Sequence, residues 1–519
     1  MILFSDVVYY SSLLTCMSLG SYYKKIVDID IKRSYGAGLG ILLTCLICGQ
    51  YMVHSVLMVW GNIVIIKCCD KRYIHHLSLA YTWVYLLYMS FNIESTIYVL
   101  WMHQAMALRL VGLAFELNMA DKMKQQSVTG RGSQKTLNLS SRAALHSNPE
   151  NSNSGILNHN VQTESSKASS LKGHGMTSRL SSSEKTYFPT GKSSMNKMNF
   201  GDTNNLPTEP SATDIIAYAY YFIGLHKGPY YRWKTFNEHF RTPFGVLGDC
   251  RIITEQKLKK ALICTLIYTL LQMKFPVQIY DENDFYVSYG TDFRYLYNIP
   301  QMLIYVLQYQ VVMFLCSGVC TEAGFGVYPT KTLPIPGFGP SARFSLLNLA
   351  TITEEVALEQ EYNFAMLKSF DNEKLLIGPR MRDTLRGWDM STRYWFWAHA
   401  YKNISRTSKE ARSAISFLAW SVWCGPTIQQ MIIASTLWVH LHLECEYGEL
   451  YDTNVGMKMP WDIGFSIMRL FCLIYLTPCF ILRDSSVVLR YYHSIFWVYH
   501  MVLFILILGA LGASKERLS

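Results

Sequence analysis

Two short motifs place reactive side chains in strongly apolar surroundings. In "LRGWDMSTRYWFW", Asp389 stands among aromatic residues, and in "LAWSVWCGPTIQ", Cys424 precedes a Gly-Pro pair. A carboxyl can act as a general base when ionised and as a hydrogen-bond donor when protonated. A thiolate can carry an acyl group. These are the two places where the chain could carry proton-transfer or covalent chemistry.

Each motif also has an ordinary structural interpretation. Arg386 and Arg393 lie about one helical turn on either side of Asp389 and could neutralise its carboxylate. A thiol in apolar surroundings is inert and usually serves packing, so Cys424 could be a simple core residue. His399 is an alternative base on the same expected helix, about 15 Å from Asp389 at about 1.5 Å per residue. The sequence leaves these alternatives open.

Basic residues interleave with aromatic residues in two further segments. Arg232 and Lys234 belong to "YYFIGLHKGPYYRWKTFNEHFRTPFG", and Arg380 and Arg382 to "IGPRMRDTLRGW". These four cations are candidates for binding a substrate phosphate or headgroup. The alternative is an interfacial belt in which long basic side chains reach toward water. We see no Cys/His spacing typical of a metal site and expect no metal.

The elements that position these residues are membrane helices. Half of the 519 residues are apolar and only 16% are charged, whereas soluble domains carry about 25% charged residues. Residues 38–66 contain no Asp, Glu, Lys or Arg, and similar apolar runs recur along the chain. At about 20 residues per span, they predict an all-α polytopic bundle with roughly ten spans, some broken or re-entrant. Gly49-Gln50 and Gly425-Pro426 are the expected breaks.

Composition divides the chain into three parts. Residues 1–120 form an N-terminal transmembrane block and residues 211–519 a C-terminal block that carries both reactive motifs. Between them, residues 121–210 are rich in Ser and Asn, which predicts a disordered linker. The linker has more basic than acidic residues, so we expect it to be cytosolic. The net charge of +10 is concentrated beside apolar runs, which favours cytosolic loops over a nucleic-acid surface.

The order of these motifs resembles the membrane-bound O-acyltransferase family, in particular its lysophosphatidylinositol acyltransferase branch. The segments that carry the resemblance are "GLGILLTCLICGQYMVHSVLMVWG", "YAYYFIGLHKGPYYRWKTF", "CTEAGFGVYP", "EYNFAMLKSFDNEKLLIGPRMRDTLRGWDMSTRYWFWAHAYKN" and "ARSAISFLAWSVWCG". The resemblance implies a helical fold around a reaction tunnel in the endoplasmic reticulum membrane. It also implies acyl-CoA as co-substrate, a lysophospholipid as acceptor, and no cofactor.

The resemblance assigns the catalytic positions to the two opening motifs. The family uses an Asn in a Trp-Asn-Met-like motif and a His in a Trp-His-Gly motif. Those positions correspond to Asp389 and Cys424, while the flanking Trp388 and Trp423 are kept and are expected to contact substrate. The resemblance therefore implies a site whose two reactive residues have both changed.

The changes should impair the family's mechanism. A neutral thiol at Cys424 is a poor proton acceptor, and losing a general base typically costs about 10²–10⁴-fold in rate. An ionised Asp389 cannot donate to an oxyanion, and losing one such donor costs about 10²–10³-fold. A rearranged mechanism, with Asp389 as the base and an acylated Cys424, is an alternative.

Three functions follow as hypotheses. The first is transfer of a polyunsaturated acyl chain from acyl-CoA to lysophosphatidylinositol. The second is a catalytically impaired relative that binds acyl-CoA or lysolipid, or that partners an active paralogue. The third is a lipid transporter, which should show charge pairs near the membrane midplane and repeated halves. The sequence has neither, and it has no nucleic-acid-binding motif.

Overall fold

The computed structural model describes residues 4–93, 95–144, 209–404, 408–453 and 458–518. Nearly all secondary structure in this part of the chain is helical, which confirms the all-α class. The exception is a short antiparallel pair, β1 (Tyr328–Pro329) and β2 (Tyr362–Asn363). The helices are α1 Phe4–Lys24, α2 Ile29–Cys48, η1 Gly49–Tyr51, α3 Met52–Cys68, α4 Ile74–Asn92, α5 Ile97–Ala144, α6 Ala212–Ala219, α7 Trp233–His239, α8 Phe244–Leu247, α9 Cys250–Lys274, η2 Val277–Asp281, α10 Asn283–Val287, α11 Thr291–Leu296, α12 Asn298–Glu322, η3 Thr330–Thr332, α13 Phe344–Ile352, α14 Glu354–Leu358, η4 Ala365–Leu367, α15 Asn372–Leu376, α16 Met381–Gly387, α17 Met390–Trp395, η5 Phe396–Tyr401, α18 Lys409–Cys424, α19 Ile428–Thr453, α20 Lys458–Ile481, α21 Ser485–Ser494 and α22 Val498–Leu518.

Several helices are long and apolar enough to cross a membrane, so the protein is a multi-pass membrane protein. Among the described residues they number five, or six if the bent pair α21 and α22 forms one broken span. This is fewer than the roughly ten spans expected at about 20 residues each. The difference arises because some apolar runs fall on helices that are short or carry polar residues. The run at 414–443, for example, is divided between α18 and α19.

Both expected helix breaks are confirmed, and both use the conformational freedom of glycine. Gly49 has φ 53° and ends α2, after which η1 leads into α3. Gly425 has φ 121° and ends α18, and α19 begins three residues later at Ile428. A residue with a Cβ would be strained at these φ values. The Gly425-Pro426 break leaves Cys424 at the very end of α18.

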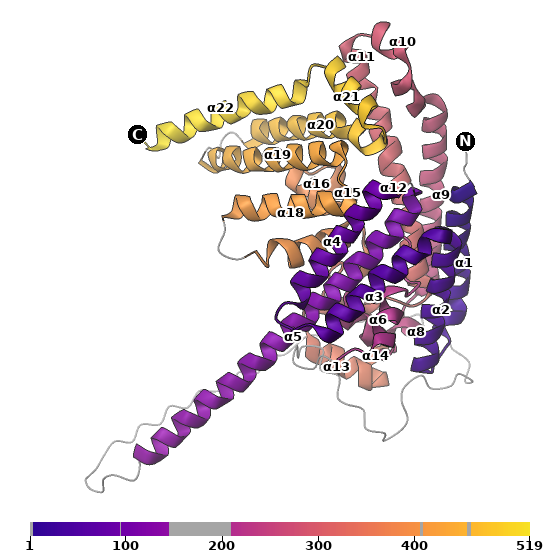
Figure 1. Ribbon diagram of the computed structural model, residues 1–519, viewed down its shortest axis with the longest axis vertical. Helices are drawn as coiled ribbons and strands as arrows, with labels where there is room; N and C mark the ends of the chain where they lie inside the picture. The colour runs from indigo at the N-terminus through magenta and orange to yellow at the C-terminus, as the bar shows by residue number, and fades with distance from the viewer. Residues whose placement is uncertain (1–3, 94, 145–208, 405–407, 454–457, 519) are drawn as a thin grey trace, which may run out of the picture.

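The molecule has two hydrophobic cores, and α12 belongs to the first while it also packs against α20 of the second (Figure 1). The first core is built from α1–α6, the segment after α6 and the second half of α12. The second core lies among α19, α20, α21 and α22. In Figure 1, α18, α19, α20 and α22 run beside one another, and α21 lies at their end. Residues from both sides of the predicted linker share the first core, so the two blocks pack together.

Helix α5 is longer than the sequence interpretation allows. It continues to Ala144, so the first part of the predicted linker, residues 121–144, is helical and projects from the body (Figure 1). The cause is that Lys, Gln, Met and Ala are good helix formers, and extending an existing helix adds one hydrogen bond per residue. The remainder of that prediction, residues 145–208, lies outside the described residues.

One face of α5 contacts the segments that build the candidate site. The contacting residues follow a four-residue spacing and are Gln104, Leu108, Gly112 and Glu116. A Cβ on Gly112 would lie 2.5 Å from the Tyr230 hydroxyl oxygen, so glycine is required for this approach. Glu116 accepts the backbone N–H of Trp233 at 2.8 Å. These contacts fix α5 against the segment 220–234.

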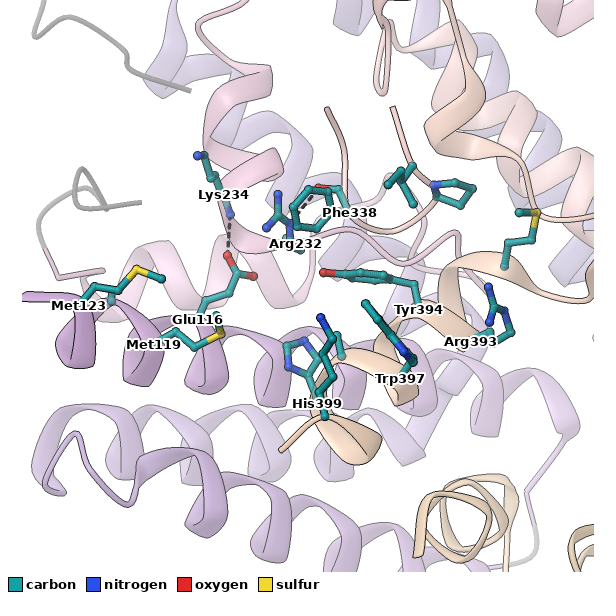
Figure 2. A pocket seen from close by; sticks show the side chains of 16 residues that line it. Glu116, Met119, Met123, Arg232, Lys234, Phe338, Arg393, Tyr394, Trp397 and His399 are labelled. Carbon is teal, nitrogen blue, oxygen red and sulfur yellow. Dashed lines mark hydrogen bonds between the residues drawn. The ribbon is translucent and has the colours of Figure 1, made fainter. Parts of the chain in front are cut away.

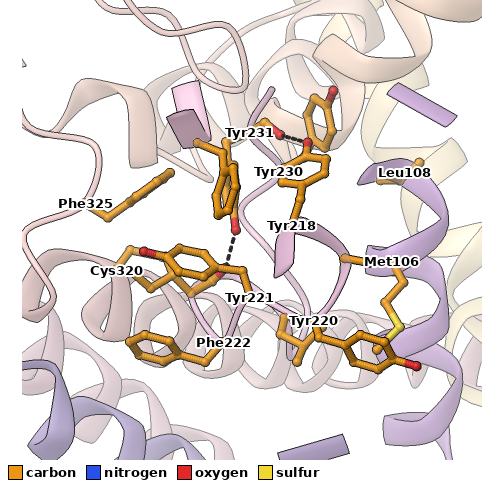
Figure 3. Close-up of a cluster of buried hydrophobic side chains, with 14 of the residues drawn as sticks. Met106, Leu108, Tyr218, Tyr220, Tyr221, Phe222, Tyr230, Tyr231, Cys320 and Phe325 are labelled. Atoms are coloured by element: carbon orange, nitrogen blue, oxygen red, sulfur yellow. Dashed lines mark hydrogen bonds between the residues drawn. The ribbon is translucent and has the colours of Figure 1, made fainter. Parts of the chain in front are cut away.

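Residues 220–232 form a largely buried loop without regular structure, which we call the buried loop. Irregular backbone can lie in the interior only if its polar groups find partners. Arg109 on α5 provides them by donating to four carbonyl oxygens at 2.5–3.2 Å, those of Tyr218, Ala219, Tyr221 and Ile223. The Tyr231 hydroxyl also donates to the Ile223 carbonyl, as Figure 3 shows within the surrounding aromatic cluster. Arg109 therefore stabilises the position of the buried loop against α5 through these hydrogen bonds.

Candidate active site

Asp389 lies at the start of α17 in a conformation that few residues adopt. It has φ 36° and ψ 63°, and only 6% of the residue is exposed. Its carboxylate accepts the Tyr309 hydroxyl at 3.0 Å and the Thr392 N–H at 3.4 Å. Asn and Asp tolerate the left-handed region better than other residues with a Cβ. The position therefore suits an Asp or an Asn and few other side chains.

The ordinary interpretation of Asp389 as an Arg partner is wrong for this structure. Arg386 points to Asp383 instead, with a nitrogen–oxygen distance of 3.8 Å. Within the described ranges, no ion pair joins Asp389 to Arg386 or Arg393. The helical phase that suggested these pairs is broken because Asp389 is the left-handed residue between α16 and α17.

Cys424 is held beside α5 by its backbone. Gln104 donates its side-chain amide to the carbonyl oxygens of Trp423 at 3.0 Å and Cys424 at 3.5 Å. In return, the Trp423 indole N–H donates to the Gln104 carbonyl at 3.2 Å. In the part of the chain that the structure describes, no hydrogen bond links the Cys424 thiol to the Asp389 carboxylate. The geometry that a rearranged Asp–Cys pair needs is thus not formed here.

Aromatic rings form one wall beside Asp389. Trp388 packs against Tyr309 and Phe370, with ring centroids 4.9 and 5.0 Å apart, and stacks on Tyr305 at 6.0 Å. Trp388, Tyr305 and Tyr309 are each partly exposed. Their exposed surfaces provide an apolar lining of the kind that an acyl chain would contact.

Lys227 is the central residue that the sequence interpretation missed. It belongs to the buried loop, and its ammonium donates to the Gln104 side-chain oxygen at 3.3 Å. Three rings surround the ammonium at 4.9–5.6 Å, those of Trp101, Tyr309 and Trp423. A lysine between apolar runs in "YYFIGLHKGPYY" was a usable sign, because ionisable residues in such positions are commonly functional. From this segment, the neighbouring Arg232 and Lys234 were instead selected from the sequence as substrate-binding candidates.

The charges of Lys227 and Asp389 act on each other. Desolvation raises the pKa of the Asp389 carboxyl above its ordinary value, and the Lys227 ammonium opposes that rise. Desolvation likewise lowers the pKa of the Lys227 ammonium, and Asp389 opposes the decrease. No ion pair joins them directly among the described residues. The site thus holds a basic and an acidic group that interact electrostatically without direct contact.

A cavity of about 580 Å³ opens next to α17 and contains two of the predicted substrate-binding residues (Figure 2). Arg232 and Lys234 line it together with Arg393 and Lys402. Arg232 is fixed by a 2.8 Å hydrogen bond to the Phe338 carbonyl and lies 3.7 Å from that residue's ring centroid. The other aromatic and polar lining residues include Glu116, Tyr394, Trp397 and His399. This combination suits a ligand with several phosphates and a planar base.

His399, the alternative base, lines the same cavity. It lies in the π-helical turn η5, which changes the phase that an α-helix would have given it. The residue is 6% exposed, and neither ring nitrogen has a hydrogen-bond partner. Its surroundings are Phe115 and Trp395 at ring distances of 4.8 and 5.2 Å. His399 therefore belongs to the cavity and not to the immediate surroundings of Asp389.

Arg380 and Arg382 lie elsewhere, at the contact between α16 and α19. Glu444 accepts the backbone N–H groups of Met381 at 2.6 Å and Arg382 at 3.4 Å. The Arg382 guanidinium lies 4.0 Å from the same carboxylate, and Arg380 packs over the ring of Phe465. An acidic group at a helix N-terminus is favourable, which explains this arrangement. The structure does not bring these two arginines to the cavity.

Residues 86–481 match the sequence profile of the membrane-bound O-acyltransferase family, and this range includes both Asp389 and Cys424. The chain belongs to the membrane-bound O-acyltransferase family. The described residues include no group of three His, Cys, Asp or Glu that could hold a metal ion.

Curated relatives of this membrane-bound O-acyltransferase share its whole length at low identity. Three membrane-bound acylglycerophosphatidylinositol O-acyltransferases are similar to it, from Drosophila melanogaster, Xenopus laevis and Homo sapiens, at 24%, 23% and 24% identity. The matches cover 96%, 99% and 96% of this chain and 89%, 95% and 91% of the relatives. They support an acyltransferase of phospholipid remodelling.

Proposed function

We propose that the protein transfers a polyunsaturated acyl chain from acyl-CoA to lysophosphatidylinositol in the endoplasmic reticulum membrane. The similarity to acylglycerophosphatidylinositol O-acyltransferases supports a lysophosphatidylinositol acceptor. The acyl donor is supported by the cavity beside α17. Residues 145–208, which the proposal places on the cytosolic side, lie outside the described residues.

The observation that carries the proposal is the position of the cation-lined cavity relative to Asp389. Met390 and Arg393, both within one turn of Asp389, line that cavity. Arginine pairs with phosphate in a two-pronged geometry, and Trp397 offers a surface on which an adenine ring can stack. A CoA nucleotide held there would direct its thioester arm toward Asp389 and the aromatic wall around Trp388.

The proposed reaction is attack of the lysophospholipid hydroxyl on the thioester carbonyl. It requires a group that accepts the hydroxyl proton and a donor that stabilises the carbonyl oxygen as it becomes negative. Asp389 and Cys424 occupy the positions where the resemblance expects these groups. The enclosed surroundings would exclude water, which protects the thioester from hydrolysis.

A second candidate function is a catalytically impaired relative. It is favoured by the identity of Asp389 and Cys424, since a neutral thiol is a poor base and an ionised carboxylate is no hydrogen-bond donor. Such a protein would keep the cavity and bind acyl-CoA, or partner an active paralogue, without turnover of its own.

The test compares the natural protein with Asp389→Asn/Cys424→His in membranes that lack endogenous activity. Transfer from arachidonoyl-CoA to lysophosphatidylinositol is measured together with binding of a non-reactive thioether analogue of arachidonoyl-CoA. Turnover by the natural protein supports the proposal. Turnover by the double variant alone supports the impaired relative. If both bind the analogue and neither transfers the acyl chain, the acceptor or the reaction is wrong.

A further inference from the structure

Lys227 is a cation whose hydrogen-bonding capacity is only partly used. An ammonium has three donors, and the Gln104 side-chain oxygen takes one of them at 3.3 Å. The rings around it attract the charge but accept no strong hydrogen bond. The residue is partly exposed, and it lines a small internal cavity of about 10 Å³, the size of one water molecule. Donors therefore remain for a bound molecule.

Tyr309 links this cation to Asp389. Its hydroxyl donates to the Asp389 carboxylate at 3.0 Å, and its ring centroid lies 5.6 Å from the Lys227 ammonium. The Thr392 N–H holds the other carboxylate oxygen at 3.4 Å. The two charges are thus positioned by separate partners, and no direct ion pair between them exists in the described ranges. The ammonium and the carboxylate are therefore two distinct polar groups that can act on different atoms of a substrate.

We propose that Lys227 and Asp389 divide the two catalytic tasks that the changed positions no longer perform in the family's way. The Lys227 ammonium donates to the thioester carbonyl oxygen, and the Asp389 carboxylate accepts the proton of the attacking hydroxyl. Compared with the family's arrangement, the Asn position changes from donor to acceptor and the donor moves to the buried loop. This inference rests on the proposed acyl transfer.

The proposed step is balanced without any further reactant. The lysolipid hydroxyl oxygen forms a bond to the carbonyl carbon while its proton passes to Asp389. The carbonyl oxygen takes the electron pair, and its negative charge lies against Lys227. When the C–O double bond re-forms, the carbon–sulfur bond breaks and the CoA sulfur takes the proton from Asp389. The products are the ester and free CoA, and both side chains return to their starting states.

Cys424 has no chemical task in this scheme. Its thiol has no hydrogen bond to Asp389 within the described residues, and its contact with Gln104 is made by the backbone carbonyl. The role of the 424 position is then to end α18 at Gly425 and to present Trp423 to Lys227. This separates the inference from the rearranged mechanism in which Cys424 is acylated.

The experiment measures kcat and KM for arachidonoyl-CoA with lysophosphatidylinositol as acceptor. Lys227→Met keeps the length of the side chain and removes the charge. We expect its kcat to fall by about 10²–10³-fold, the usual effect of losing an oxyanion donor, with little change in KM. Lys227→Arg should regain part of the loss because it keeps the charge. The matched control is Lys257→Met on α9. The Lys257 ammonium donates to the Ser317 hydroxyl at 3.0 Å and does not belong to the proposed site, so this variant should keep the natural kcat.

The outcomes separate the inference from the function on which it rests. If the natural protein transfers the acyl chain and Lys227→Met does so equally fast, the inference is overturned while the proposed function stands. If the natural protein binds the thioether analogue but never transfers, the proposed function fails and the inference with it. If Lys227→Met does not bind the analogue, Lys227→Gln decides, because it keeps a hydrogen bond without the charge. Natural turnover by Lys227→Gln would then overturn the inference.

Discussion

Two cations lie at the buried loop, Arg109 on α5 and Lys227 in the loop itself, and their environments differ sharply. Arg109 donates to four loop or α6 carbonyls at 2.5–3.2 Å and is 1% exposed. Lys227 has one hydrogen bond, at 3.3 Å, and is partly exposed. A buried cation that donates to several backbone carbonyls is a structural element. A cation that is left with free donors beside a carboxylate is a candidate for chemistry. The comparison therefore separates a cation that holds the fold from one that we propose takes part in the reaction.

The largest effect is expected for Arg109→Met. It leaves several buried carbonyls without a partner, at about 1–3 kcal/mol each. The total is comparable with the whole stability of a typical protein, about 5–15 kcal/mol. We expect little folded protein by size-exclusion chromatography in detergent. Lys227→Met should purify with a melting temperature close to the natural one, and equal stability of the two variants would remove the distinction.

Asp389→Asn tests the catalytic side of the comparison. Asparagine tolerates the left-handed backbone and can still accept the Thr392 N–H, so the melting temperature should hardly change. If Asp389 is the base, kcat should fall by about 10²–10⁴-fold. In the natural protein, turnover should decrease as the pH falls through the pKa of Asp389, which burial raises. An undiminished kcat in the variant would exclude the carboxylate as the base.

A smaller effect is expected in the large cavity. Arg393→Met removes one of its cations, and one charged hydrogen bond is worth about 1.5–3 kcal/mol, so KM for acyl-CoA should rise by about tenfold or more while kcat is kept. The control is Arg251→Met, an exposed arginine on α9 that pairs with Glu255. Equal KM values for the two variants, measured at the same ionic strength, would show that the cavity does not hold the CoA phosphates.

The smallest effect is expected for Cys424→Ala. The thiol has no hydrogen bond to Asp389 among the described residues, and we assign it no proton or acyl group. Turnover should stay within about threefold of natural, since a small packing change is tolerated when neighbours adjust. A loss comparable with that of Asp389→Asn, or an acylated Cys424 in intact-mass spectra, would favour the acyl-thiol mechanism over the Lys227 scheme.

Local features of the fold could be predicted from sequence because each rests on neighbouring residues. The breaks at Gly49 and Gly425 follow from backbone freedom, and the all-α class follows from apolar run length. Arg232 and Lys234 were predicted from the sequence to contact substrate, and the structure places both residues in the lining of one cavity. That they bind substrate stays a prediction.

Features that depend on distant partners could not be predicted. The N-terminus of α16 is taken by Glu444, about 60 residues further along the chain, which removes Arg380 and Arg382 from the cavity. The importance of Lys227 depends on Gln104 and Tyr309, from two helices on either side of the loop in sequence. The end of α5 was not predicted. The polar composition after residue 120 indicates that these residues cannot form a hydrophobic core, but a helix that has already formed can continue without one.

Helix α5 also fixes the distance between two parts of the candidate site. Gln104 contacts Lys227 and Glu116 lines the large cavity, and both residues lie on this one continuous helix. Twelve residues at about 1.5 Å each place Gln104 and Glu116 roughly 18 Å apart along the helix axis, and no loop lies between them. Adding or removing a single residue between them would rotate one of these side chains by about 100° around the helix axis relative to the other. The number of residues in this helix thus fixes the distance between the large cavity and Lys227.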